Sequence, residues 1–142
     1  MSAFDVDSFL DAQTTEAASK RPPLPAGMEY TGTIGEPVTR SGEKEGKPWA
    51  AMDFPIQLTL PEGETVSLKY GTFIDVTDDG KSLDWSPGRN SGLRRLREAT
   101  GLNEKGKTFS PRMLQGRQVR VKIKHRLYEG EVFDEIGAVA KV

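Results

Sequence analysis

The chain has 142 residues, enough for one domain with or without a tail, and its formal net charge of −1 excludes no class of partner before the distribution of the charges is examined. Cysteine is absent, which excludes disulfides, thiolate catalysis and zinc–thiolate sites. The chain has no run of 18 apolar residues and its N-terminus lacks the basic and apolar regions of a signal peptide, so we expect a cytoplasmic protein without membrane contact.

Residues 1–24 are predicted to form a flexible acidic N-terminal segment that ends in a proline-rich linker. Asp, Ser, Thr, Ala and Glu dominate its first 20 residues, so at most one short helical turn is expected there. The prolines that follow favour extended backbone. We therefore place the folded domain at residues 25–142.

Period-two alternation of apolar side chains predicts three strands in the first half of this domain, at about residues 28–38, 49–60 and 66–70. A glycine-bearing loop over residues 41–48 separates the first two. Residues 74–90 are predicted to form a long connection without regular structure.

One principal helix is expected at about residues 91–100, because apolar residues recur there at intervals of three and four. Asn90 or Ser91 is the expected N-cap, and Gly101 suits a left-handed stop. Two strands joined by a hairpin at Glu129 and Gly130 complete the chain. The order β-β-β-α-β-β predicts a mainly β protein with the five-stranded, partly open barrel of the OB-fold. A five-stranded sheet with a different pairing is the alternative.

The charges are separated along the sequence. Residues 89–126 contain twelve basic and two acidic residues, a balance of +10, and the rest of the chain balances at −11. Such asymmetry indicates a polyanionic partner for the basic part. The alternative is a solvated surface whose two halves neutralise each other in the fold.

A row of cations is predicted on one face of the strand at residues 118–128. Side chains alternate along a strand, so apolar residues share one face and the basic residues share the other, spaced by about 6.6–6.8 Å. This spacing resembles that of phosphates in an extended single strand. Protection of a sheet edge is the alternative. The row consists of Arg120, Lys122, Lys124, Arg126 and, at its end, Tyr128.

Aromatic residues with polar neighbours offer surfaces on which bases stack. Trp49, which follows Lys47 and has outward parity, is the best candidate, and Phe73, Trp85 and Tyr128 are further ones. Tyr70 shares the parity of its apolar neighbours and is expected in the core. The candidate nucleic-acid-binding residues are Lys47, Trp49, Lys69, Trp85, Arg89, Arg94, Arg97, Arg120, Lys122, Lys124, Arg126 and Tyr128.

Motifs for catalysis are unconvincing. Residues 101–108 (GLNEKGKT) match the pattern of a phosphate-binding P-loop, but a helix is predicted before them and Pro111 follows, whereas a P-loop joins a strand to a helix. An acidic run that begins at Asp75 has Ser86 where a calcium loop requires glutamate. His125, the single histidine, has no nucleophile at a recognisable spacing. We expect no enzyme activity, no cofactor and no metal site; nucleotide hydrolysis at the octapeptide is the enzymatic alternative.

Four segments together resemble phage-encoded single-stranded DNA-binding proteins of the OB-fold type: residues 25–30 (PAGMEY), 41–47 (SGEKEGK), 93–102 (LRRLREATGL) and 116–123 (GRQVRVKI). The resemblance implies protection of single strands during phage replication or recombination in a bacterial host. It implies replication or recombination proteins as partners and leaves a homo-oligomer open. Many such proteins end in an acidic tail, whereas residues 138–142 are AVAKV, so a recruiting role passes to the acidic N-terminal segment. The alternative is an OB-like phage accessory or protein-interaction module whose basic surface meets an acidic protein.

Overall fold

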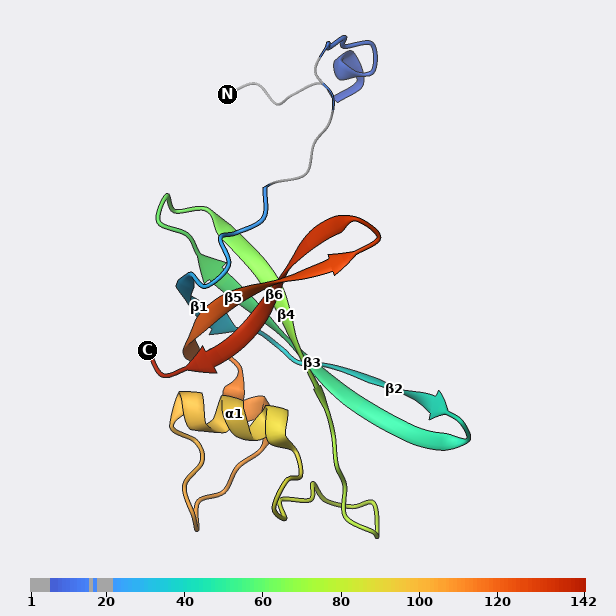
Figure 1. Cartoon of the computed structure of the whole chain (residues 1–142), viewed down its shortest axis with the longest axis vertical. Helices are drawn as coiled ribbons and strands as arrows, with labels where there is room; N and C mark the ends of the chain where they lie inside the picture. Colours follow the sequence, from blue (N-terminus) through green and yellow to red (C-terminus); the bar gives the residue numbers. More distant parts are fainter. Residues whose placement is uncertain (1–5, 16, 18–21) are drawn as a thin grey trace.

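A computed structural model describes residues 6–15, 17 and 22–142 of the chain (Figure 1). The predicted flexible segment, residues 1–24, therefore lies partly outside the described residues. Its described part contains one 3-10 turn, η1 (Val6–Phe9), with no buried side chain. In its described residues the segment thus contains no more than the one short turn expected.

The end of the proline-rich linker is part of the folded body. The Leu24 side chain is buried, and its backbone N–H donates to Asp134 Oδ1 at 2.9 Å. The Leu24 carbonyl oxygen lies 2.6 Å from His125 Nε2. His125 therefore helps to hold the linker against the last hairpin.

The described residues form one mainly β body with a six-stranded antiparallel sheet (Figure 1). The long strand β3 pairs along one edge with β4, and along the other edge first with β2 and then with β1. β1 continues to β5, and β5 to β6. The strands are β1 (Glu29–Ile34), β2 (Val38–Lys44), β3 (Lys47–Thr59), β4 (Thr65–Phe73), β5 (Gln118–Tyr128) and β6 (Glu131–Ala140).

The prediction of five strands is wrong by one, because the first predicted strand is interrupted after Ile34. Gly35 approaches β3 so closely that its N–H donates to the Pro55 carbonyl at 2.7 Å and a Cβ would lie 3.0 Å from the Pro55 ring. Pro37, which has no N–H to donate, follows this contact. The chain therefore leaves β1 and starts again as β2.

The predicted loop over residues 41–48 is also wrong, since strand pairing fills most of it. β2 and β3 pair up to Lys44 and Lys47, and only Glu45 and Gly46 connect them. Both connecting residues have positive φ, 54° and 77°, as a type I′ hairpin turn requires. This makes β2 and β3 one long hairpin.

The one α-helix of the described residues, α1 (Ser91–Thr100), packs against β4, β5 and β6. Its apolar stripe of Leu93, Leu96 and Ala99 is buried, as its spacing predicts. A 3-10 turn, η2 (Pro111–Leu114), adds Leu114 to the core. The strands supply Tyr30, Ile34, Phe54, Ile56, Leu58, Val119, Val121 and Ile123.

The two ends of α1 differ from each other. Gly101 adopts the expected left-handed conformation, with φ of 76°, and its N–H and the next one bond to helix carbonyls. Asn90 is the N-cap residue, one of the two positions predicted, but its side chain makes no capping hydrogen bond. Asn90 is itself left-handed, with φ of 49°, and its buried amide bonds to the preceding loop.

The sheet does not close into a complete barrel. Backbones of β4 and β6 approach within 8 Å, yet no ladder joins them in the described residues. α1 packs against both strands at this opening. None of the helices in the described ranges is long and apolar enough to cross a membrane.

Candidate nucleic-acid interface

The outward face of β2, β3 and β4 carries an aromatic pair. The register places Trp49 opposite Gly42 on one side and Ala51 opposite Phe73 on the other. A Cβ on Gly42 would lie 2.8 Å from the indole, so the ring covers the bare glycine backbone. Trp49 and Phe73 meet edge to face, with centroids 5.9 Å apart and planes at 81°. Phe73 is 71% exposed, so the sheet holds this pair in contact with solvent.

Beside the pair lies a hollow of about 510 Å³, which we call the hairpin groove. Lys44 and Lys47 flank the two-residue turn as cross-strand neighbours. Three cationic side chains and one carboxylate line the groove, so it combines aromatic surface with positive charge. The lining residues are Arg40, Lys44, Glu45, Lys47, Pro48, Trp49 and Phe73.

A second hollow, of about 800 Å³, occupies the opening between β4, β6 and the start of α1, and we call it the strand groove. Lys69, Arg95 and Lys124 contribute positive charge to its lining, and Asp75 and Glu135 contribute negative charge. Phe73 lines both grooves, so they are neighbours on the surface and share this side chain.

Two hairpins extend from the same side of the body, and each contributes residues to one of the grooves. Figure 1 shows the β2–β3 hairpin and the β5–β6 hairpin both projecting to the right, with β4 running between their bases. The second hairpin turns at Glu129 and Gly130, both with positive φ, as predicted. The β2–β3 arm lines the hairpin groove, and residues of the β5–β6 arm, among them Lys124 and Glu135, line part of the strand groove.

One carboxylate is buried under this surface. Asp53 is 5% exposed and accepts two hydrogen bonds from the Arg40 guanidinium, with Nη2 to Oδ1 at 3.1 Å. Lys69 Nζ lies 3.8 Å from the same carboxylate. The hydrogen bonds from Arg40 hold the pKa of Asp53 below its ordinary value, against the opposing effect of burial. Two of the cations near the grooves are thereby partly neutralised.

The structure divides the predicted cation row. Lys124 lines the strand groove, but Arg120 lies 3.9 Å from Glu29 of β1 and does not line it. Lys122 is exposed, without an ion pair to any described residue, and lines neither groove. A strand coils as it runs, so residues of one face do not all meet the same surface.

Arg126 and Tyr128 lie further out on the β5–β6 hairpin. Arg126 Nε is 2.9 Å from Glu135, which also contacts Lys124 at 3.5 Å. The Arg126 guanidinium also lies 5.9 Å from the Tyr128 ring. Tyr128 is exposed, so this arm presents one aromatic ring together with cations that share a carboxylate.

The helix contributes one cation to the grooves, and it is not among those expected. Arg95 lines the strand groove. Arg94 lies 3.9 Å from Glu98 one turn along. Arg97, expected to contact phosphate, is 9% exposed and donates from Nε to the Leu102 carbonyl at 3.1 Å. Burial therefore makes Arg97 part of the fold, which corrects the expectation.

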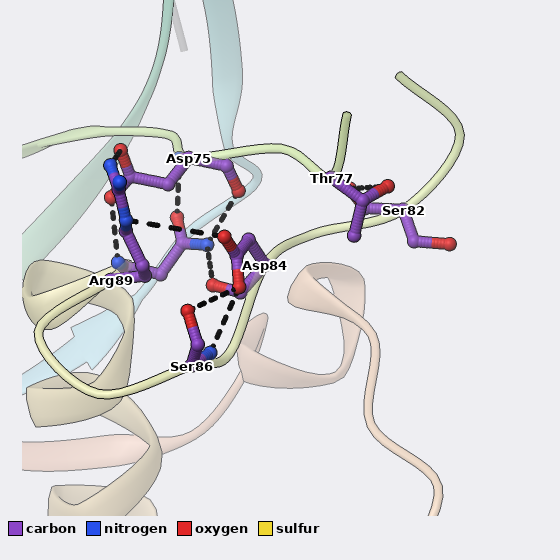
Figure 2. A network of polar contacts seen from close by, with 7 residues as sticks. Asp75, Thr77, Ser82, Asp84, Ser86 and Arg89 are labelled. Carbon is purple, nitrogen blue, oxygen red and sulfur yellow. Dashed lines mark hydrogen bonds and ion pairs between the residues drawn. The ribbon is translucent and has the colours of Figure 1, made fainter. Parts of the chain in front are cut away.

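Arg89 is held within the loop before α1, as Figure 2 shows. Its guanidinium lies 3.5 Å from Asp75 and 4.0 Å from Asp84. The buried Asn90 amide donates to the carbonyls of both aspartates, and Ser86 bonds to Asp84. This network holds the loop in place. The positive charge of Arg89 is compensated within it by Asp75 and Asp84.

Trp85 lies in a separate cluster. Its ring meets Phe109 edge to face at 5.9 Å, and Arg97 lies 4.6 Å from Trp85 and 4.2 Å from Phe109. We call Trp85, Phe109 and Arg97 the Trp85 cluster. None of the three lines either groove, so the structure does not bring the two predicted tryptophans into one site.

The structure also places residues at the grooves that the sequence interpretation left out. Arg40 and Lys44 belong to β2, which was read partly as a loop, so their parity was not recognised. Arg95 could not be told from its neighbours Arg94 and Arg97, because all three lie off the apolar stripe. The useful signal was Gly42, whose missing side chain opposite Trp49 makes room for the ring.

The P-loop-like octapeptide has the neighbours that the sequence predicts. α1 ends just before it, and the 3-10 turn η2 follows at Pro111. The strand–loop–helix arrangement that directs backbone amides at a phosphate is therefore absent from this part of the described chain.

Comparison of the sequence with models of known protein families found no match, and comparison with curated proteins found none that is significantly similar.

Proposed function

We propose that this protein binds single-stranded DNA with little sequence preference along the two neighbouring grooves. The observation that carries the proposal is the aromatic pair of half-buried Trp49 and exposed Phe73, set between groups of cations on either side. Stacking of a base on an aromatic ring contributes about 1–3 kcal/mol and does not depend on which base is stacked.

The charges support a path for the nucleic-acid backbone. Lys44 and Lys47 lie on one side of the aromatic pair, and Arg95 and Lys124 lie in the strand groove on the other. A strand that crosses between them could stack bases on the pair and place phosphates near both groups. Bases are free for such stacking only in a single strand, which favours it over a duplex.

The proposal includes an open OB-like architecture. In an OB-fold, oligonucleotides bind the face of the second and third strands and the loops between strands 1 and 2 and between 4 and 5. If β1 and β2 together take the place of the first strand, this face corresponds to β3 and β4. The two loops then correspond to the turns of the two arms. The missing β4–β6 ladder would be the open part of the barrel.

The biological setting is proposed from the resemblance alone. It would be protection of single strands during phage replication or recombination, in the host cytoplasm. The alternative is a protein-interaction module, favoured by the rigid aromatic pair beside the hairpin groove, which would also suit an acidic protein with an aromatic anchor.

A salt titration tests the proposal. A fluorescently labelled oligothymidylate is titrated with the protein at several salt concentrations between about 50 and 200 mM, with duplex DNA of equal length as competitor. Neutralising about four phosphates predicts a slope of log K against log salt near −3. Preference for the duplex, or a slope near zero, would contradict single-strand binding and leave the protein-interaction module.

A further inference from the structure

Asp53 stands out as the one acid on an otherwise neutral or cationic face. The outward register positions of β2, β3 and β4 hold Arg40, Lys44, Lys47 and Lys69, and Asp53 is the single acid among them. A buried carboxylate is costly unless it is paired and hydrogen-bonded. Such a group would also repel a phosphate that approached it.

The surrounding backbone is shaped to hold this carboxylate. Asp53 pairs with Gly71 of β4, and a Cβ on Gly71 would lie 3.0 Å from Asp53 Oδ1. The missing side chain at residue 71 leaves room for the carboxylate between β3 and its neighbours. Arg40 reaches it from β2, through two of the five N–H groups of its guanidinium.

The same contact fixes the Arg40 guanidinium beside the aromatic pair. Arg40 Cζ lies 5.6 Å from the centroid of the Trp49 ring. A guanidinium held by a carboxylate at its edge keeps its planar faces out of that contact, and its charge is already compensated. Arg40 therefore lies over the Trp49 ring as a compensated planar group rather than as a free cation.

Resting on the proposed single-strand binding, we infer that Asp53 is a positioning residue that withholds Arg40 from phosphate and keeps its guanidinium plane beside Trp49 for contact with a base. Base contact and phosphate contact are thereby assigned to different cations. Arg40 contacts a base. The phosphates are contacted by four other cations: Lys44, Lys47, Arg95 and Lys124.

The variant Asp53→Asn tests this assignment, because asparagine has nearly the same shape and no charge. Released from the carboxylate, Arg40 becomes available to phosphate, so the slope of log K against log salt for an oligothymidylate should steepen by about 0.7. Compared with the wild type, the variant should bind more tightly at low salt and more weakly at high salt, where stacking dominates. The plots of log K against log salt for the two proteins should therefore cross. A role confined to stability would change the melting temperature and leave the slope as in the wild type.

The double variant Arg40→Gln/Asp53→Asn provides a second test if the single variant fails to fold, because it removes the guanidinium together with its carboxylate partner. It removes one positive and one negative charge, so the slope should equal that of the wild type while affinity falls several-fold. A slope shallower by about 0.7 would mean that Arg40 contacts phosphate in the wild type and would overturn the inference. An unchanged slope in a folded Asp53→Asn protein would overturn it too. Absence of single-strand binding by the wild type is a separate result, which refutes the proposed function itself.

Discussion

The molecule contains two tryptophans in nearly the same local arrangement and with opposite surroundings. Trp49 meets Phe73, and Trp85 meets Phe109, both at 5.9 Å and close to perpendicular. Each tryptophan also has an arginine near its ring. Composition alone would give the two clusters the same role.

Burial separates them. Arg97 is 9% exposed, lies within 5 Å of both its rings and bonds to the Leu102 carbonyl, so it ties α1 to the loops on either side. Desolvation lowers the pKa of Arg97, the direction expected for a cation inside the fold. Arg40 and Phe73 remain open to solvent beside a groove. The comparison teaches that an aromatic–arginine cluster stabilises the fold when the arginine is enclosed and offers a binding surface when it is not.

The largest expected difference between the two clusters is seen when each tryptophan is exchanged for alanine. Trp49→Ala should weaken single-strand binding by about 1–3 kcal/mol, the contribution of one stacked base, and change the melting temperature little. Trp85→Ala should lower the melting temperature and leave affinity unchanged. Titration and thermal unfolding of both variants measure the two effects, and equal affinity losses would remove the distinction.

A change in the enclosed arginine sharpens the same contrast. Arg97→Met should reduce the free energy of unfolding by about 1–2 kcal/mol, because a hydrogen bond and a desolvated cation–π contact are lost. The salt slope of binding should stay as in the wild type. Denaturant unfolding measures the first quantity, and a shallower slope would show that Arg97 does contact phosphate.

Two residues of the predicted cation row test how far the binding surface extends beyond Trp49, Phe73 and Arg40. Lys124→Gln should make the salt slope shallower by about 0.7 and weaken binding a few-fold, because Lys124 lines the strand groove. Arg120→Gln is the matched control, since Arg120 pairs with Glu29 and does not line the groove. If the control shows the larger effect, the path of the single strand follows β5 instead.

The smallest expected effect is on the stability of the fold at acidic pH. Because Arg40 holds the pKa of Asp53 below its ordinary value of 3.8, the pair stabilises the fold above about pH 4. This contribution is lost as the pH falls through the lowered pKa. Wild-type protein should therefore lose more stability than Asp53→Asn between about pH 5 and pH 2. The Arg97→Met variant should behave like the wild type in this range, because Arg97 has no carboxylate partner among the described residues. Melting temperatures across the range provide the measurement.

Local patterns in the sequence were sufficient to predict the helix, the last hairpin and the outward parity of Trp49. The break after Ile34 was not predictable, because it depends on the approach of Gly35 to Pro55, 20 residues along the chain. The burial of Arg97 depends in the same way on Phe109, whose position only the folded loop determines. Charge patterning identified the basic region, but the course of β5 in the folded sheet decides that Lys124, and not Arg120, lines the strand groove.

Fluorescence of a single tryptophan tests the central claim most directly. In a Trp85→Phe variant, Trp49 is the sole tryptophan and reports on the proposed stacking surface. Addition of oligothymidylate should quench its emission saturably, with the same affinity as anisotropy gives, and added salt should reverse the quenching. Binding seen by anisotropy without any change in Trp49 emission, or no binding at all, would contradict the account.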